Sequence, residues 1–165
     1  MLGACGGYFA GAAPLVDYLK YAAGGFVYSV GMPPPVAAAA LAALEILRRE
    51  PERVQRLQDN SLAFAAACRS AGLDIGSSVG QAIVPVMTGD SIRAAALSQR
   101  LFERGINVQP IIAPAIPERL ARLRFFLSSE HARADLETTV QAVADELATV
   151  NAASPAALVR RAEAS

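Results

Sequence analysis

The sequence predicts an α/β domain in which helices pack on one face of a small sheet. In four long segments, apolar residues recur every three or four positions, as expected for amphipathic helices. Shorter segments rich in β-branched and aromatic residues lie between them, and glycine or proline stands at most of the boundaries. With 165 residues, 53% of them hydrophobic, the chain is long enough to bury one core.

The first third of the chain is punctuated by glycine and proline. The short apolar stretch within residues 6–11 predicts a strand that ends in a turn. A helix is expected over residues 14–23, because a proline suits its first turn and two glycines follow its end. Residues 26–32 are expected to be extended or looping. A longer helix is then predicted over residues 33–50, with an apolar stripe formed by Val36, Ala40, Leu44 and Leu47.

The remaining two thirds predict helices and strands in alternation. Strands are expected over residues 82–87, 106–110 and 123–127. Helices are expected over residues 52–71, 91–104 and 132–150, and two of them are followed by a glycine that suits a helix end. The segment after residue 150 breaks the apolar pattern, and residues 151–165 are expected to be a disordered tail.

Charge and cysteine content exclude several classes of function. Fifteen basic and fifteen acidic side chains give a formal net charge of zero, so the chain offers no excess charge for binding nucleic acid or an anionic membrane. The uncharged run over residues 27–44 contains three prolines and many alanines, which argues against a membrane span. Cys5 and Cys68 show no CxxC spacing, so neither a metal site nor a disulfide framework is indicated. A reducing, cytoplasmic setting is expected.

Four stretches, in order, resemble the α-oxoamine synthases, which are enzymes dependent on pyridoxal 5'-phosphate (PLP). The stretches are LGACGGY at residues 2–8, FVYSVGMPP at residues 26–34, GINVQP at residues 105–110 and RLRFFLSSEH at residues 122–131. Members of the family join an amino acid to an acyl thioester, carried by CoA or by an acyl-carrier protein, and usually release carbon dioxide. The resemblance spans almost the whole chain.

The resemblance implies the C-terminal small domain of a fold-type-I PLP enzyme, with a mostly antiparallel sheet. The last strand and the connecting helices of the large domain would lie at the N-terminus. On this basis, residues 1–32 are a remnant of the large PLP-binding domain, residues 33–50 a connecting helix and residues 51–150 the small domain. The complete enzyme would be a homodimer. The family's Schiff-base lysine would fall just upstream of Met1, so the chain by itself is expected to be inactive.

Arg124 is the strongest candidate for a substrate-binding residue. The strand period places Leu123, Phe125 and Leu127 on one face and Arg124 with Phe126 on the other, so a guanidinium projects from a rigid platform. Such a planar set of donors matches the two oxygens of a carboxylate. The resemblance implies that Arg124 binds the α-carboxylate of the amino acid. An ion pair at the surface of an edge strand is the structural alternative.

Four residues are candidates for binding the cofactor. The resemblance places Tyr28 and Ser29 where family members contact the PLP phosphate of the other subunit, and a hydroxyl beside backbone amides suits that dianion. Gly6 and Gly7 would bring the backbone close to the cofactor, since glycine has no side chain in the way. An ordinary turn at each of these positions remains the structural alternative.

Lys20 and His131 are each the only residue of their type. Lys20 lies three positions after Asp17 on a predicted helix, which favours a solvated ion pair over the desolvated amine that forms a Schiff base, so it is a poor candidate for that role. His131 precedes the last predicted helix and is expected to be structural. Ala132, which follows it, cannot cap that helix with a side chain.

Two functions remain open at this stage. The first is the C-terminal part of a PLP-dependent acyltransferase whose catalytic lysine lies elsewhere. The second is a non-catalytic dimerising module, analogous to a lysine-less partner subunit of such an enzyme.

Overall fold

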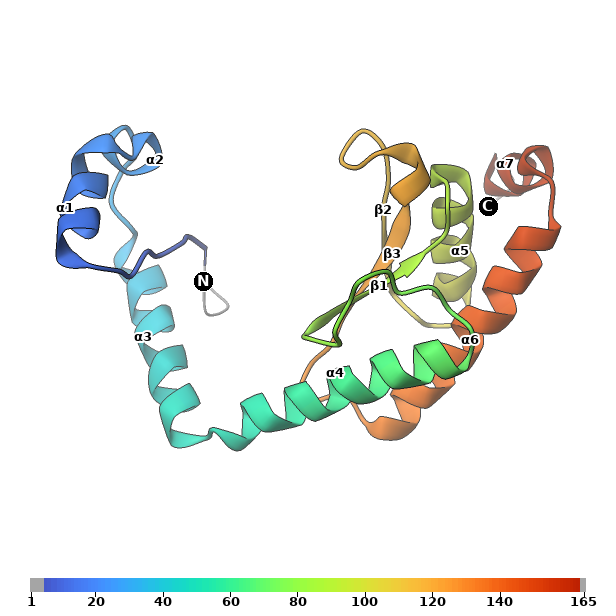
Figure 1. Cartoon of the computed structure of the whole chain (residues 1–165), viewed down its shortest axis with the longest axis horizontal. Coiled ribbons are helices and arrows are strands. Elements are labelled where there is room, and N and C mark those ends of the chain that lie inside the picture. Colours follow the sequence, from blue (N-terminus) through green and yellow to red (C-terminus); the bar gives the residue numbers. More distant parts are fainter. Residues whose placement is uncertain (1–4, 164–165) are drawn as a thin grey trace. The chain divides into compact units, whose positions relative to one another are not determined.

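The computed structural model describes residues 5–163, with side chains described through residue 159. Its contacts divide the chain into two compact units, one covering residues 1–51 and the other residues 52–165. Figure 1 labels the elements of both units.

The first unit is built from three helices, α1 (Ala13–Ala22), α2 (Gly24–Val27) and α3 (Pro34–Arg49). Both longer helices have a proline at the first or second position, where its missing N–H is not needed. Among the described residues of this unit only Ala40 is buried, so the predicted apolar stripe of α3 does not form a core. Leu44, for example, is 46% exposed.

Two predictions for the first unit are wrong. No strand forms within residues 6–11, because the described part of this unit contains no other strand to pair with it. The segment 26–32 is not wholly irregular either, because its first two residues complete the short helix α2.

The second unit is an antiparallel sheet with helices on one face (Figure 1). The strands are β1 (Ile83–Met87), β2 (Gln109–Ile111) and β3 (Arg122–Phe126), in the order β1-β3-β2, and both neighbours pair with the central strand β3. The helices that bury the sheet's inner face are α4 (Glu52–Ser70), α5 (Ser91–Glu103) and α6 (Arg133–Ala152). This confirms the α/β class and the one-sided helix layer predicted from the sequence.

Alternation along the strands supplies the sheet's share of the core. Val84 and Val86 of β1 and Leu123 and Phe125 of β3 are buried, while Phe126 is 62% exposed. The helices contribute the larger share, from residues spaced mostly three or four apart: Phe64, Ala65 and Cys68 on α4, Ala94, Leu97 and Leu101 on α5, and Leu136, Val140 and Val143 on α6. The predicted helical periods therefore correspond to the core of this unit, although Val54, in the first turn of α4, is exposed.

Two elements of the second unit differ from prediction. Strand β2 begins at Gln109, three residues later than expected, because it pairs with β3 only opposite residues 122–124. The tail expected to be disordered instead contains helix α7 (Pro155–Glu163), which packs against α5 and buries Leu158. Leu158 gives this helix an apolar anchor in the core.

The connection from β2 to β3 is tied to the start of α5. The Glu118 carboxylate, in the short 3-10 helix η1 (Glu118–Leu120), accepts hydrogen bonds from the Ser91 backbone N–H at 2.7 Å and from its hydroxyl at 2.5 Å. The Ser91 hydroxyl oxygen in turn accepts from the Ala113 N–H at 3.3 Å. The two bonds from Ser91 hold the pKa of Glu118 below its usual value, because both stabilise the charged carboxylate.

Among the helices of the described residues, none has an apolar stretch long enough to cross a membrane.

The burial of Cys68 allows a direct test of the core of the second unit. Burial raises the pKa of the Cys68 thiol to about 11, although the charge of Arg69 opposes the rise. Because the thiolate is the form that attacks thiol reagents, the exposed Cys5 is expected to react rapidly and Cys68 only when the unit unfolds. Timed labelling with a thiol reagent should therefore show two well-separated phases, with Cys5→Ala retaining only the slow one. Rapid labelling of both thiols in the native chain would contradict this core.

Candidate functional site

Arg124 lies at the centre of the second unit's sheet. It sits opposite Pro85 of β1 and Gln109 of β2, so its backbone is held from both sides. Leu123 and Phe125, its neighbours along β3, are buried among the helices, whereas Arg124 is partly exposed. The pleat of the strand therefore directs Arg124 away from the helix layer, as the alternation predicted.

The Arg124 guanidinium makes no hydrogen bond or ion pair with the residues that the structure describes. Two other partly buried arginines of this unit have partners within it. Arg100 pairs with Glu146 at 2.5 Å, and the Nε atom of Arg122 donates to the Leu120 carbonyl at 2.9 Å. Arg124 is thus a partly buried cation on a rigid strand, with all of its side-chain donors available for a ligand.

A cavity of about 430 Å³ opens beside Arg124, at the end of the sheet where β2 begins. We call it the edge cavity. It is lined by residues of α4, of the segment leading into β2, of β3, and of the turn and helix that follow β3: Phe64, residues 105–109, residues 124–126, His131, Asp135, Leu136 and Thr139. Its volume is within the range of small-molecule sites.

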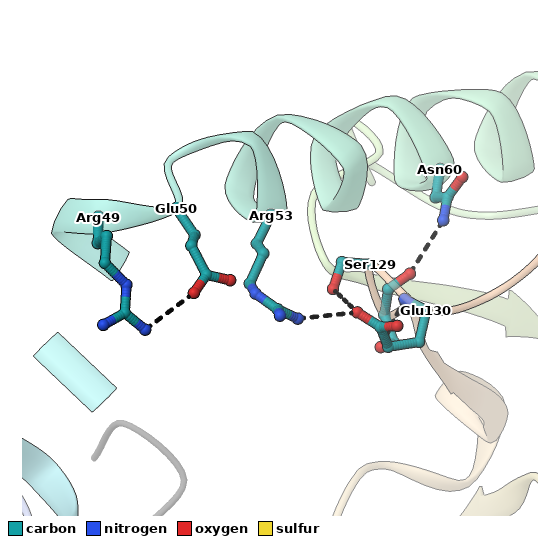
Figure 2. A network of polar contacts seen from close by, with 7 residues as sticks. Arg49, Glu50, Arg53, Asn60, Ser129 and Glu130 are labelled. Carbon is teal, nitrogen blue, oxygen red and sulfur yellow. Dashed lines mark hydrogen bonds and ion pairs between the residues drawn. The ribbon is translucent and has the colours of Figure 1, made fainter. Parts of the chain in front are cut away.

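Helix α4 holds the turn that follows β3 (Figure 2). The Asn60 side-chain amide donates to the carbonyls of Ser128 and His131, both at 3.0 Å. Arg53 pairs with Glu130 at 3.1 Å. Because Asn60 bridges both ends of the turn, it fixes the backbone between β3 and α6, and with it one wall of the edge cavity.

His131 stabilises this turn and leaves the start of α6 uncapped. Its Nδ1 atom accepts a hydrogen bond from the Ser128 backbone N–H at 3.3 Å. The N-cap of α6 is Ala132, which is extended and makes no side-chain hydrogen bond. His131 therefore has the structural role expected of it, and its ring also lines the edge cavity.

The candidate cofactor residues all lie in the first unit. Gly6 has φ +121°, and a Cβ placed on it would come within 3.4 Å of the Met32 Cε atom, so Gly6 lies against the end of the Tyr28–Met32 segment, whereas a Cβ on Gly7 would meet nothing within 4 Å. Tyr28 ends helix α2 and is 91% exposed. The Ser29 hydroxyl, also exposed, donates only to the carbonyl of the next residue, Val30, at 3.3 Å. Arg124 belongs to the other unit.

Lys20 is a surface residue. Its Nζ atom lies 2.8 Å from the Asp17 carboxylate, and its side chain is 56% exposed. This is the solvated ion pair predicted from the sequence, and it leaves the chain's only lysine without the desolvation that makes an amine nucleophilic.

Residues 1–143 match the model of the aminotransferase class I and II family. Related solved structures agree with that match. A serine palmitoyltransferase of Sphingomonas wittichii superposes with a TM-score of 0.77 at 25% identity, over 91% of this chain and 38% of the other. An 8-amino-7-oxononanoate synthase of Francisella tularensis superposes with a TM-score of 0.69 at 25% identity, over 84% of this chain and 40% of the other. The chain belongs to the aminotransferase class I and II family of PLP-dependent enzymes.

Within that family, its relatives are α-oxoamine synthases, as the resemblance implied. The 8-amino-7-oxononanoate synthase of Symbiobacterium thermophilum is 39% identical over 143 residues, which cover 87% of this chain and 36% of the relative. The 4-hydroxy-2,2'-bipyrrole-5-methanol synthase PigH of Serratia sp. is 35% identical over 136 residues, which cover 82% of this chain and 21% of the relative. The chain therefore spans about a third or less of the length of these curated relatives.

The complete enzymes of this family use PLP, and the residues present here fit part of that group. The exposed Ser29 hydroxyl suits the phosphate of PLP. Gly6 has a positive φ, which residues with a side chain rarely adopt. The exposed, ion-paired Lys20 does not suit covalent attachment.

The edge cavity and the Asn60 bridge were not found from the sequence. The cavity is assembled from segments far apart in the chain. Asn60 is a polar residue on a helix, and the local sequence does not show its hydrogen-bond partners. A family alignment with an invariant asparagine at this position would have been the signal.

The uncapped α6 offers a stability test. Ala132→Thr places a hydroxyl where it can accept from a free N–H of the first turn, and it should raise the free energy of unfolding by about 1 kcal/mol. Ala132→Val has a similar shape without the oxygen and is the matched control. Urea denaturation measures both. Equal effects of Thr and Val would show that capping is not limiting here.

Proposed function

We propose that this chain is the C-terminal part of a PLP-dependent acyltransferase that condenses an acyl thioester with a small amino acid. In the reaction, the α-carbon of the amino acid bonds to the thioester carbonyl carbon, the thiol leaves, and the α-carboxylate is usually lost as carbon dioxide. The thioester is carried by CoA or by an acyl-carrier protein. Support comes from the names of the relatives and from the placement of Arg124 on β3.

The placement of Arg124 on β3 is the main structural support for this function. A guanidinium held by a strand paired on both sides can bind the two oxygens of an α-carboxylate with little loss of side-chain freedom. It thereby orients the amino acid, since the carboxylate is fixed relative to the sheet. The lack of a carboxylate partner among the described residues leaves it available for this role.

The first unit is proposed to bind the cofactor in a homodimer. Ser29 and Tyr28 would bind the PLP phosphate of the partner subunit, and Gly6 and Gly7 would let the backbone approach the ring. PLP, when bound, withdraws electrons from the α-carbon of the amino acid. We place the enzyme in the cytoplasm, because its two cysteines give no disulfide pattern.

A non-catalytic dimerising module is the second candidate. Like the first candidate, it agrees with an exposed Lys20 that is paired with Asp17 and is not placed as a Schiff base. Such a module would contribute Ser29 across the interface without catalysing the reaction. An upstream coding run with a serine-lysine pair in the same frame would favour the acyltransferase.

PLP binding tests the role of Lys20. The 165-residue chain mixed with PLP should develop no specific yellow absorbance and no synthase activity, whereas the complete enzyme containing it should show both. Lys20→Arg, which keeps the ion pair with Asp17, should leave both results unchanged. Yellow absorbance that disappears in Lys20→Arg would show that Lys20 binds PLP and that the proposal is wrong on this point.

Substitution of Arg124 tests the substrate site. In the complete enzyme, Arg124→Ala should raise the KM for the amino acid about tenfold to a hundredfold, because a charged hydrogen-bonding partner of the carboxylate is lost. Arg122→Ala is the matched control, since Arg122 stands two positions earlier on the same strand but donates to the Leu120 carbonyl. Steady-state kinetics with the thioester held saturating measures both. An unchanged KM in Arg124→Ala would remove this residue from the site.

A further inference from the structure

The edge cavity exists because the two outer strands cover different lengths of β3. Strand β1 runs alongside β3 as far as Phe126, which faces Ile83. Strand β2 begins only at Gln109, opposite Arg124. On the β2 side, the last two residues of β3 are therefore not covered by a strand, and the segment leading into β2 forms the far wall of a space of about 430 Å³.

The floor of the edge cavity is apolar and rigid. Phe64, Phe125 and Leu136 line it, and each belongs to the buried core. The rings of Phe64 and Phe125 lie 5.2 Å apart, centroid to centroid, at an angle of 45°, a favourable aromatic packing. Ile106 and Val108 extend the apolar surface along the wall. An apolar chain entering here would leave water for a surface already fixed by packing.

The rim of the edge cavity is polar but has no excess charge. Arg124 contributes one positive charge and Asp135 one negative charge, while Asn107, Gln109 and Thr139 offer uncharged hydrogen-bonding groups. A phosphate or another polyanion would find a single cation beside a carboxylate, a poor match. An apolar chain joined to an uncharged, amide-containing arm matches both the floor and the rim.

We propose that the edge cavity binds the acyl chain of the thioester substrate, with the neighbouring pantetheine amides at its rim. This inference rests on the proposed acyltransferase function and names its second substrate as a thioester with an extended apolar chain. Arg124 lines the same cavity. The amino acid and the acyl chain are therefore recognised by adjacent residues of one strand.

An apolar floor of this kind distinguishes thioester substrates by the length of their acyl chain. Each methylene group moved from water onto the apolar floor should raise kcat/KM about fourfold, until the chain reaches the end of the cavity. Short acyl groups would end at the rim and gain nothing from the floor. The shared chemistry of CoA and carrier-protein thioesters is the acyl-pantetheine arm.

The experiment compares two adjacent threonines of α6 in the complete enzyme. Thr139 lines the edge cavity, whereas Thr138 is exposed and donates its hydroxyl to the Ala134 carbonyl within the helix. In Thr139→Phe the added ring should lower kcat/KM for the longest S-acyl-pantetheine substrates about tenfold, the loss of nearly two methylene contacts. Values for acetyl-pantetheine should fall less, because that substrate shares only the pantetheine arm near Thr139, and the KM for the amino acid should not change. Thr138→Phe should behave as wild type.

Asn107→Phe provides a second variant, because Asn107 lines the cavity from the segment before β2 and not from α6. It should reproduce the shift towards shorter chains, and slow labelling of Cys68 shows that each variant keeps its core. Repeating the series with CoA and carrier-protein thioesters identifies the natural carrier as the one giving the higher kcat/KM.

Three results would overturn the inference. One is a wild-type kcat/KM that does not depend on chain length, and another is an equal effect of Thr138→Phe and Thr139→Phe. The third is that no thioester changes the hydrogen-exchange protection of the Phe125 and Phe126 amides. That result would indicate that another segment of the complete enzyme fills the cavity. Each leaves the effect of Arg124→Ala on the amino-acid KM as an independent test of the proposed function.

Discussion

The central position of β3 is the constraint on which the second unit depends. Because β3 is paired on both sides, its register fixes which side chains face the helices and which face away. A slip of one residue would turn Leu123 and Phe125 out of the core and turn Arg124 into it. Burying an unpaired guanidinium costs several kcal/mol, so the same alternation that builds the core also keeps Arg124 accessible.

The sequence predicts those elements whose own residues determine them. Helices α4, α5 and α6 and strands β1 and β3 have clear apolar periods, and each lies within three residues of its predicted bounds. Strand β2 has no strong period, so its place follows from its pairing with β3, and Pro110 is tolerated because the strand is at the edge. Helix α7 depends on the packing of Leu158 in the core, a contact that the local pattern does not show.

Part of the candidate site could likewise be predicted from local sequence, and part could not. The direction of Arg124 follows from a period of two within five residues, so it could be predicted. The edge cavity could not, since residues 105–109, 124–126 and 131–139 approach one another only in the folded unit. In the first unit, the apolar period predicted helix α3, but the pattern does not say what covers the stripe, and Leu44 remains exposed.

In the proposed enzyme, β3 would also set the distance between the two substrates. Arg124 and Phe125 are adjacent on one strand, which separates their backbones by about 3.4 Å. A carboxylate on Arg124 and an acyl chain on Phe125 would therefore be held by one hydrogen-bonded ribbon and not by two independent loops. Because small displacements of reacting atoms lower rates strongly, such shared support favours condensation. The Asn60 bridge contributes to the same end, since it holds the turn into which β3 runs.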